Sequence, residues 1–192
     1  MLLKRIKLII ILIGFAFFVV LLFYFIQQSS DLSADRHDEQ EKINLVGKPM
    51  RLKIPGINID SAVEYVGLTS DGAMDVPENQ DDVAWFERGQ RPGENGSAVI
   101  AGHYGWKNGR ASVFDNLHKL REGDKLYIED DKGVIIYFVV RESRIYDPNA
   151  DASDVFGSND GKSHLNLITC EGTWDKVSKS YSKRLVIFTD KE

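Results

Sequence analysis

The chain of 192 residues has little that would indicate a disulfide scaffold, a nucleic-acid binder or a metalloprotein. It holds one cysteine, Cys170, so no disulfide can form within it. Beyond residue 26 it has 21 basic and 29 acidic residues and no cluster of Lys and Arg, which argues against nucleic acid as a partner. Glu129, Asp130, Asp131 and Glu142 could bind Ca²⁺, but acidic hairpin turns are usually solvated. We therefore expect no metal and no cofactor.

One apolar run stands out in this composition. Residues 8–26 (LIIILIGFAFFVVLLFYFI) are 19 consecutive residues without a charge, and as a helix they would span roughly 28 Å, close to the hydrocarbon thickness of a bilayer. Three basic residues precede the run and the next charge, Asp31, is negative, which places the N-terminus in the cytoplasm and the rest outside. A cleaved signal peptide is the alternative, but its apolar stretch is usually about 7–15 residues and ends in small residues. The sequence favours an uncleaved anchor.

Four segments follow from this pattern. Residues 1–7 form a basic cytoplasmic N-terminus, 8–26 a single transmembrane helix, 27–47 a polar extracytoplasmic stalk, and 48–192 one domain outside the cell membrane. An unpaired cysteine in an exported domain is open to oxidation and mispairing, so it requires burial or a chemical use. This is the first indication that Cys170 is reactive.

The domain is predicted to be mainly β, because short apolar or alternating segments are bounded by turn residues. The predicted strands are Met50–Ile54, Ile57–Val66, Ser97–Ala101, Lys125–Glu129, Val134–Val140, Leu165–Thr169 and Leu185–Phe188. Short helical turns are expected at Ser112–Leu120 and Asp151–Phe156. Strands that do not alternate regularly with helices favour an antiparallel barrel or sandwich, and the pattern does not choose between them.

A cysteine and a histidine occupy similar places at the ends of predicted strands. Cys170 directly follows Leu165–Thr169, and a thiolate there would attack a carbonyl carbon well, although a buried structural cysteine is the alternative. His103 comes just after the predicted strand Ser97–Ala101 and lies between Gly102 and Gly105. These small residues would let a substrate backbone approach closely. The other three histidines are expected in the stalk, on a helical surface and in a loop: His37, His118 and His164.

An arginine completes the set. Arg184 opens the predicted last strand, 14 residues after Cys170, so an antiparallel pairing would bring it back beside Cys170. Its guanidinium could then donate to a developing oxyanion and to a substrate carbonyl. A solvated arginine at a strand edge is the alternative.

These residues together resemble the sortase family. Leu165–Cys170 (LNLITC) matches the family's strand that ends in Thr-x-Thr-Cys or a close variant, Ser97–His103 matches its histidine strand, and Arg184 matches its arginine at the start of the last strand. Arg51–Pro55 resembles the first strand and Val83–Phe86 the segment before the histidine strand. The resemblance covers nearly the whole domain with the three catalytic positions in the right order.

The resemblance implies an eight-stranded β-barrel with short helices and an active-site groove at one end. It implies a transpeptidase that cleaves an LPXTG-like sorting signal of secreted proteins between Thr and Gly, forms a thioester on Cys170, and transfers the protein to an amine of a lipid-linked peptidoglycan precursor. His103 would serve as general acid and then base, and Arg184 would hold the substrate and the oxyanion. Thr169 and Trp174 are candidate substrate-binding residues.

The subclass and the side-chain details are less determined by the sequence. Neither a hydrophobic C-terminal segment nor a lid motif is present, which argues against the pilus-polymerising class, and Glu171–Lys183 resembles class F or D sortases of Gram-positive bacteria. Asn166 stands where Thr is commoner in the family, which we interpret as neutral for catalysis. Trp174 and Tyr181 could line the groove or pack on the barrel.

Three other functions are alternatives to the sortase hypothesis. A cysteine peptidase that hydrolyses the same signal could use the same three residues. A membrane-tethered binding module could carry an inert Cys170. An L,D-transpeptidase is the third alternative, but the Ser-x-Gly-Cys motif of that family is absent around Cys170.

Overall fold

The chain divides into two compact units, Met1–Leu45 and Val46–Glu192. The computed structural model describes residues 18, 20–27, 46–107 and 109–192, and in the first unit residues 20–27 are helical and exposed. Within these described ranges no helix is long and apolar enough to span a membrane. The predicted anchor and stalk lie largely outside the described residues and stay predictions.

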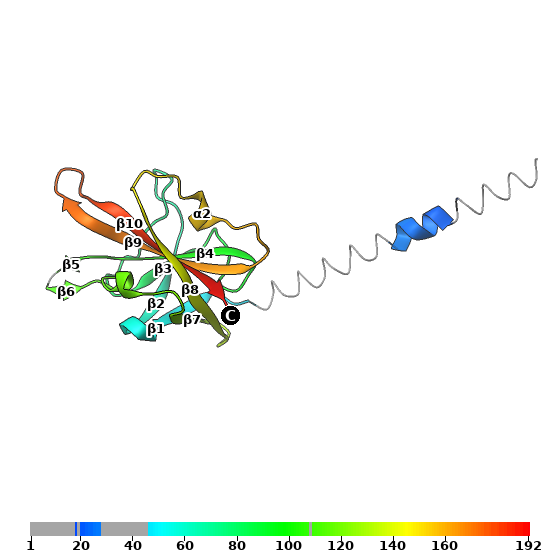
Figure 1. The fold of residues 1–192 in the computed structure, drawn as a ribbon, viewed down its shortest axis with the longest axis horizontal. Coiled ribbons are helices and arrows are strands. Elements are labelled where there is room, and N and C mark those ends of the chain that lie inside the picture. The colour runs from blue at the N-terminus through cyan, green and yellow to red at the C-terminus, as the bar shows by residue number, and fades with distance from the viewer. Residues whose placement is uncertain (1–17, 19, 28–45, 108) are drawn as a thin grey trace, which may run out of the picture. The chain divides into compact units, whose positions relative to one another are not determined.

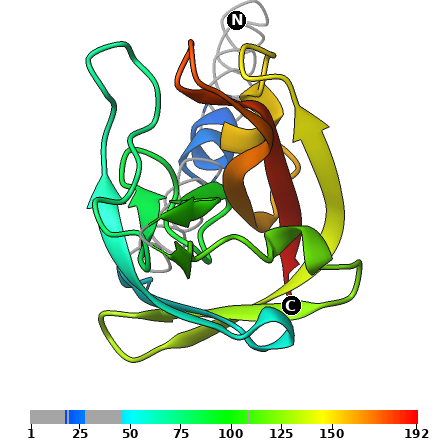
Figure 2. The same cartoon turned by 90° about the vertical axis from the view of Figure 1, so that its left-hand side faces the viewer.

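Eight strands of the second unit close into a β-barrel, which Figure 1 shows from the side and Figure 2 as a ring of strands. Their order around the barrel is β1-β2-β3-β4-β9-β10-β8-β7. The strands are β1 Pro49–Ile54, β2 Ile59–Val66, β3 Val83–Phe86, β4 Gly96–Gly102, β7 Lys125–Asp130, β8 Ile135–Tyr146, β9 Ser163–Asp175 and β10 Ser180–Lys191. The predicted mainly-β, eight-stranded barrel is confirmed, and the alternative of a sandwich is excluded.

The connections carry a small ribbon and three short helical elements. The ribbon pairs β5 Trp106–Lys107 with β6 Arg110–Ala111, and the helical elements are η1 Pro55–Ile57, η2 Leu117–Lys119 and α2 Ser153–Phe156. Both predicted helical turns are confirmed by η2 and α2. The prediction of a strand from Ile57 was wrong at its start, because Pro55 begins a 3₁₀ turn and Asn58 adopts a left-handed conformation with φ of 56° before β2 begins.

Alternating side chains fill the barrel interior. The inward-facing residues of β1, β7, β8 and β9 that are fully buried include Leu52, Ile54, Leu126, Ile128, Phe138, Leu165 and Leu167. Burial of each such side chain contributes about 1.5–3 kcal/mol. A second, smaller apolar cluster lies on the outer face of β4 and β10, where Val99, Val186 and Phe188 pack with Val155 of α2. Because β4 is covered on both faces, its sequence is a continuous apolar run.

Two of the eight strand pairings are parallel, namely β2 with β3 and β4 with β9. The sequence pattern had favoured antiparallel pairing throughout. A parallel pair requires a crossover connection, and the chain from β4 to β9 supplies one that contains β5 to β8 and α2. Burial on both faces, which makes a strand uniformly apolar, is the usual environment of a parallel strand.

The last two strands are longer than predicted. Cys170 lies inside β9 and not after it, and Arg184 is the fifth residue of β10 and not the first. The segment Glu171–Lys183, which lies between two predicted strands, continues the β9–β10 hairpin beyond the barrel. The residues of this segment are too polar to continue the apolar pattern of the strands. A register shift between Tyr181 and Lys183 also interrupts the alternation, so the hydrophobic pattern could not predict this part of β9 and β10.

Candidate active site

Cys170 and Arg184 are direct cross-strand partners in the β9–β10 pair. Opposed residues of an antiparallel pair present their side chains on the same face, so the thiol and the guanidinium are neighbours. Cys170 is a free cysteine and is partly buried. The predicted return of Arg184 to the side of Cys170 is confirmed.

His103 is brought to the same level by the parallel pair β4–β9. In this pair Ala101 lies opposite Ile168, and His103 and Cys170 each come two residues further along their chains. The hydroxyl of Thr169 donates to the carbonyl of Gly102 over 2.7 Å. This bond links β9 to β4 one residue before Cys170 and His103. Parallel register thus places the imidazole and the thiol at one end of the barrel.

The imidazole of His103 is held by the loop that follows β2. Its Nε2 lies 2.7 Å from the carbonyl oxygen of Pro77. A carbonyl oxygen can only accept, so Nε2 carries a hydrogen and Nδ1 is the atom that can take up or release a proton. The backbone carbonyl of His103 accepts from the N–H of Phe114 over 3.0 Å, and a side chain on Gly102 would overlap the Phe114 ring. The position of the histidine is therefore fixed from both sides.

A cavity of about 610 Å³ collects the predicted site residues. Cys170, His103 and Arg184 line it, together with Thr169 and Trp174. Its apolar wall is formed by Met74, Val76, Phe156 and Ile168, and its aromatic rim by Tyr104, Trp106, Trp174 and Tyr181. All five residues singled out from the sequence therefore meet in one cavity.

Two opposing effects set the protonation of Cys170. Burial raises the pKa of the thiol, and the nearby charge of Arg184 lowers it by less, so the net pKa lies above the ordinary value. The neutral thiol is therefore favoured near pH 7 in the free protein. Attack on a substrate then requires transfer of the thiol proton to a base, and the imidazole of His103 lines the same cavity.

The guanidinium of Arg184 is positioned by the hairpin. Nη1 donates to the carbonyls of Lys183 and Tyr181 over 2.9 and 3.1 Å, and Nη2 contacts the hydroxyl of Ser180 at 3.3 Å. These bonds use three of the five N–H donors of an arginine. Among the residues that the structure describes, the other two have no protein partner, which leaves a fork available to an oxyanion or a substrate carbonyl.

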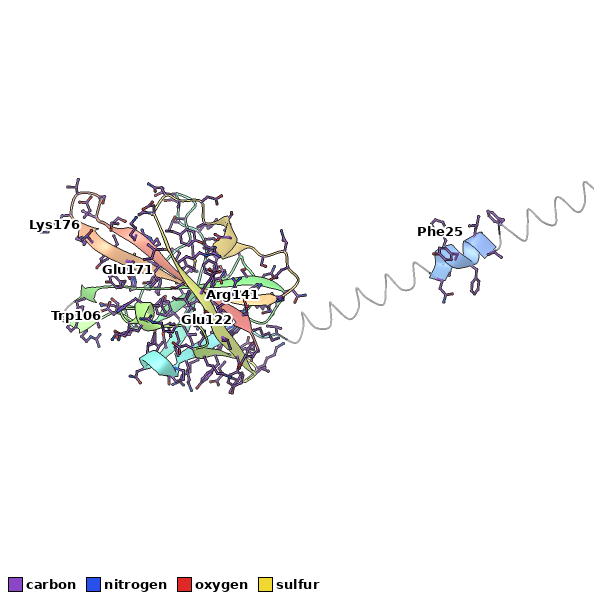
Figure 3. The ribbon with its side chains drawn as sticks, in the orientation of Figure 1. Phe25, Trp106, Glu122, Arg141, Glu171 and Lys176 are labelled. Atoms are coloured by element: carbon purple, nitrogen blue, oxygen red, sulfur yellow. The ribbon has the colours of Figure 1, made fainter. Side chains whose placement is uncertain are left out.

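The hairpin aromatics Trp174 and Tyr181 line the cavity. Tyr181 makes edge-to-face contacts with Trp174 and Tyr104, with ring centroids 5.1 and 5.2 Å apart. Gly105, with φ of 96°, passes so close that a side chain there would overlap the Tyr181 hydroxyl. Figure 3 shows that Trp106 of the ribbon lies at the same end of the unit as the hairpin tip at Lys176. Tyr104 was not predicted as a site residue, although its position next to His103 was an available signal.

Thr169 has a structural partner in addition to its place in the cavity wall. It is 3% exposed, and its hydroxyl is bonded to the Gly102 carbonyl. Thr169→Val should leave this carbonyl without its donor and lower the free energy of unfolding by about 1–3 kcal/mol, which a denaturant titration measures. Thr173→Val, on the exposed part of the hairpin, is the control and should change it by less than about 0.5 kcal/mol. Equal effects of the two substitutions would contradict this role.

The other two described histidines lie outside the cavity. His118 is exposed on η2, as expected. The prediction of a loop at His164 was wrong, because this residue is the second of β9 and is buried. Its loop-like flank of Gly161, Lys162 and Ser163 concealed the start of the strand.

The comparison with known families agrees with this geometry. The model of the Sortase domain matches residues 52–192. The chain belongs to the sortase family. No curated protein matches the chain.

Solved sortase structures share the fold. The complex of Streptococcus agalactiae sortase C1 with MTSET is 28% identical, with a TM-score of 0.58, and the match covers 74% of this sortase and 66% of that chain. Sortase C1 of GBS pilus island 1 is 29% identical, with a TM-score of 0.59 and coverage of 74% and 63%. The lid mutant of sortase A from Corynebacterium diphtheriae, 23% identical with a TM-score of 0.59 and coverage of 75% and 69%, shows the fold alone. This sortase spans a little under two thirds of the length of the two C1 chains.

Proposed function

We propose that this sortase is a cysteine transpeptidase, anchored in the cell membrane by residues 8–26 with its barrel outside. The observation that carries the proposal is the register of three strands, which sets Arg184 opposite Cys170 and His103 level with both. The substrates are secreted proteins with an LPXTG-like sorting signal, and the acceptor is an amine of a lipid-linked peptidoglycan precursor. The class F or D assignment stays a prediction, since structures named sortase A and sortase C resemble the fold equally well.

The chemistry follows from the groups in the cavity. His103 Nδ1 takes the thiol proton, and the sulfur of Cys170 attacks the Thr carbonyl carbon of the signal. The oxyanion that forms is held by the two available N–H groups of Arg184. The bond to the Gly nitrogen breaks as His103 returns a proton to it, which leaves a Thr thioester. The incoming amine gives a proton to His103, bonds to the carbonyl carbon and displaces the thiolate.

The shape of the site suits an extended peptide. A second cavity of about 440 Å³ adjoins the first and shares Met74, Phe156, Ile168 and Arg184 with it. Its walls are largely apolar, and side chains such as Leu and Pro would be desolvated there. This arrangement supports a groove that binds the residues preceding the scissile bond.

The test uses the full chain in detergent micelles with an LPXTG peptide library, with and without a primary-amine acceptor. We expect a Thr–amine product and a Thr thioester on Cys170, both detected by mass spectrometry. Hydrolysis alone at every acceptor concentration would favour the cysteine peptidase. Peptide binding without any adduct or cleavage would favour the inert binding module.

A further inference from the structure

The two cavities of the proposed groove meet at four side chains. Met74, Phe156, Ile168 and Arg184 line both cavities. Ile168 and Arg184 belong to β9 and β10 and are held by strand pairing, and Met74 is held by its bridge to Leu68. Phe156 is the last residue of α2, a single turn of helix that Figure 1 shows outside the barrel, next to β4. The space where the cavities meet therefore depends on how firmly α2 is held.

Asn166 of β9 provides a hydrogen bond to α2. This residue is 1% exposed, and its Nδ2 donates to the carbonyl of Val155 over 2.6 Å. A carbonyl oxygen can only accept, so the nitrogen of the amide must face it. The last carbonyls of a helix have no donor within the helix, and Val155 is fully buried. Asn166 therefore satisfies a buried carbonyl that α2 cannot satisfy by itself.

The other contacts of α2 with the barrel fix its position less. The side chain of Val155 packs against apolar side chains of β4 and β10, and such packing has no preferred direction. Asp154 accepts from Arg144 and Tyr146 of β8 over 2.7 and 2.8 Å, but both bonds are exposed to solvent, where ion pairs contribute little. Of these contacts, the bond from Asn166 is the one that is both buried and directional.

Phe156 directly follows the residue that Asn166 holds. Its ring contacts Phe86 of β3 edge to face, with the ring centroids 5.7 Å apart, and the side chain stays partly exposed to both cavities. A shift of the Val155 carbonyl would move this ring, because the two residues are joined by one peptide bond. An aromatic ring in a groove wall offers a large apolar surface to a peptide side chain. The position of Phe156 thus decides which side chain fits where the cavities meet.

We propose that Asn166 is a positioning residue that holds Phe156 where the two cavities meet, and that Phe156 is a specificity-determining residue for the peptide lying across them. Without the bond from Asn166, α2 takes up several positions, and the apparent affinity for peptide falls with the fraction of molecules that keep Phe156 in place. Asn166 is outside the set of described residues that line the cavity of Cys170, so its loss should leave the chemical step unchanged. The role of Phe156 rests on the proposed function, whereas the hold of Asn166 on α2 does not.

The hold on α2 is tested by hydrogen–deuterium exchange of the full chain in micelles. Asn166→Leu keeps a side chain of similar size and removes the donor. The amides of Val155 and Gly157, which bond to carbonyls at the start of α2, should then exchange about tenfold faster, while those of β1 and β7 stay unchanged. Thr189→Val is the matched control, because Thr189 is also fully buried and donates to a backbone carbonyl, that of Leu165, over 2.7 Å. It should leave the exchange of the α2 amides as in wild type.

Asn166→Thr is a second variant that tests the same bond. A Thr hydroxyl is attached directly to Cβ, one bond closer to the backbone than Nδ2 of Asn, so it falls short of the Val155 carbonyl. Thr is also the residue that is commoner in the family at this position, and it is compatible with the fold. This variant should speed the exchange of the α2 amides in the same way as Asn166→Leu.

Peptide turnover tests whether Asn166 acts through Phe156. Asn166→Leu should raise KM about tenfold and change kcat by less than about twofold, whereas Thr189→Val should change neither by more than about twofold. Phe156→Ala should raise KM by a similar factor and should admit larger apolar side chains at one position of the peptide library. The double variant of Asn166→Leu and Phe156→Ala should have the KM of Phe156→Ala alone, because the two residues act as one unit.

The outcomes that contradict the proposal are distinct from a failure of the proposed function. Unchanged exchange of the α2 amides in both Asn166 variants would overturn it, and so would effects on KM that add in the double variant. A Phe156→Ala enzyme with the library preference of wild type would overturn the role of Phe156. If no peptide turns over but the exchange results are as expected, the proposed function fails and the hold of Asn166 on α2 stands.

Discussion

Replacing Cys170 by alanine should lower kcat for transpeptidation by about 10⁴-fold or more, because the chain has no other thiol that could form the thioester. The residue lines the cavity and is only partly buried, so removal of the sulfur creates no core void. We therefore expect the melting temperature of Cys170→Ala to lie within a few degrees of wild type. Mass spectrometry of the enzyme after mixing with peptide should show the thioester in wild type and unmodified protein in the variant.

The same variant separates binding from chemistry. Peptide binding to Cys170→Ala, measured by fluorescence anisotropy, should match the affinity of the wild-type enzyme within about threefold, because the apolar walls of both cavities remain. Transpeptidation by the variant at more than about one hundredth of the wild-type rate would contradict the assignment of Cys170 as nucleophile.

Arg184→Gln should lower kcat by about 10²–10³-fold, because in the proposed reaction the two available N–H groups of the guanidinium hold the oxyanion. A second effect follows from electrostatics. Burial raises the pKa of Cys170 and the charge of Arg184 opposes that shift, so removal of the charge should raise this pKa further. The thiolate then forms at a higher pH, and alkylation at neutral pH becomes slower. The rate of alkylation of Cys170 by a small neutral reagent, measured as a function of pH, gives the pKa of the thiol and the alkylation rate at neutral pH.

A matched control tests whether the effects on kcat and on the pKa of Cys170 depend on the position of the removed charge or on the total charge of the protein. Lys176→Gln removes one positive charge from the hairpin tip, where Figure 3 shows the side chain far from the barrel. It should leave the alkylation profile and kcat unchanged within about twofold. An equal upward shift of the Cys170 pKa in both variants would show that the guanidinium has no special place beside the thiol.

The sequence predicted the features that depend on local pattern. Apolar runs such as Ser97–Ala101 and Leu165–Thr169 predicted the central strands. The positions of His103 and Cys170 just after these runs made them candidates for the site. The sequence did not reveal the parallel pairing of β4 with β9, because periodicity indicates how a strand is buried but not which strand it pairs with.

The polar contacts of the two histidines His103 and His164 could not be predicted from the sequence either. Pro77 holds His103 from a loop 26 residues away, and Asp190 meets His164 across the same separation. Nothing in the local composition marks such partners, because the first pair is created by the packing of the loop after β2 and the second by the register of the β9–β10 pair. His164 shows the limit most clearly, since its flanking residues predicted a loop while its two carboxylate partners lie in different elements.

The parallel β4–β9 pair also has a consequence for the order of events in folding. Gly102 and Thr169, which this pair joins, are 67 residues apart, so loop closure of that length must occur before the contact forms. Contacts of such high sequence separation form slowly compared with local hairpins. A nascent chain that emerges from a translocation channel would expose Cys170 without its base until the barrel closes. The topology therefore delays the meeting of Cys170 and His103 until the cavity that holds them both has formed.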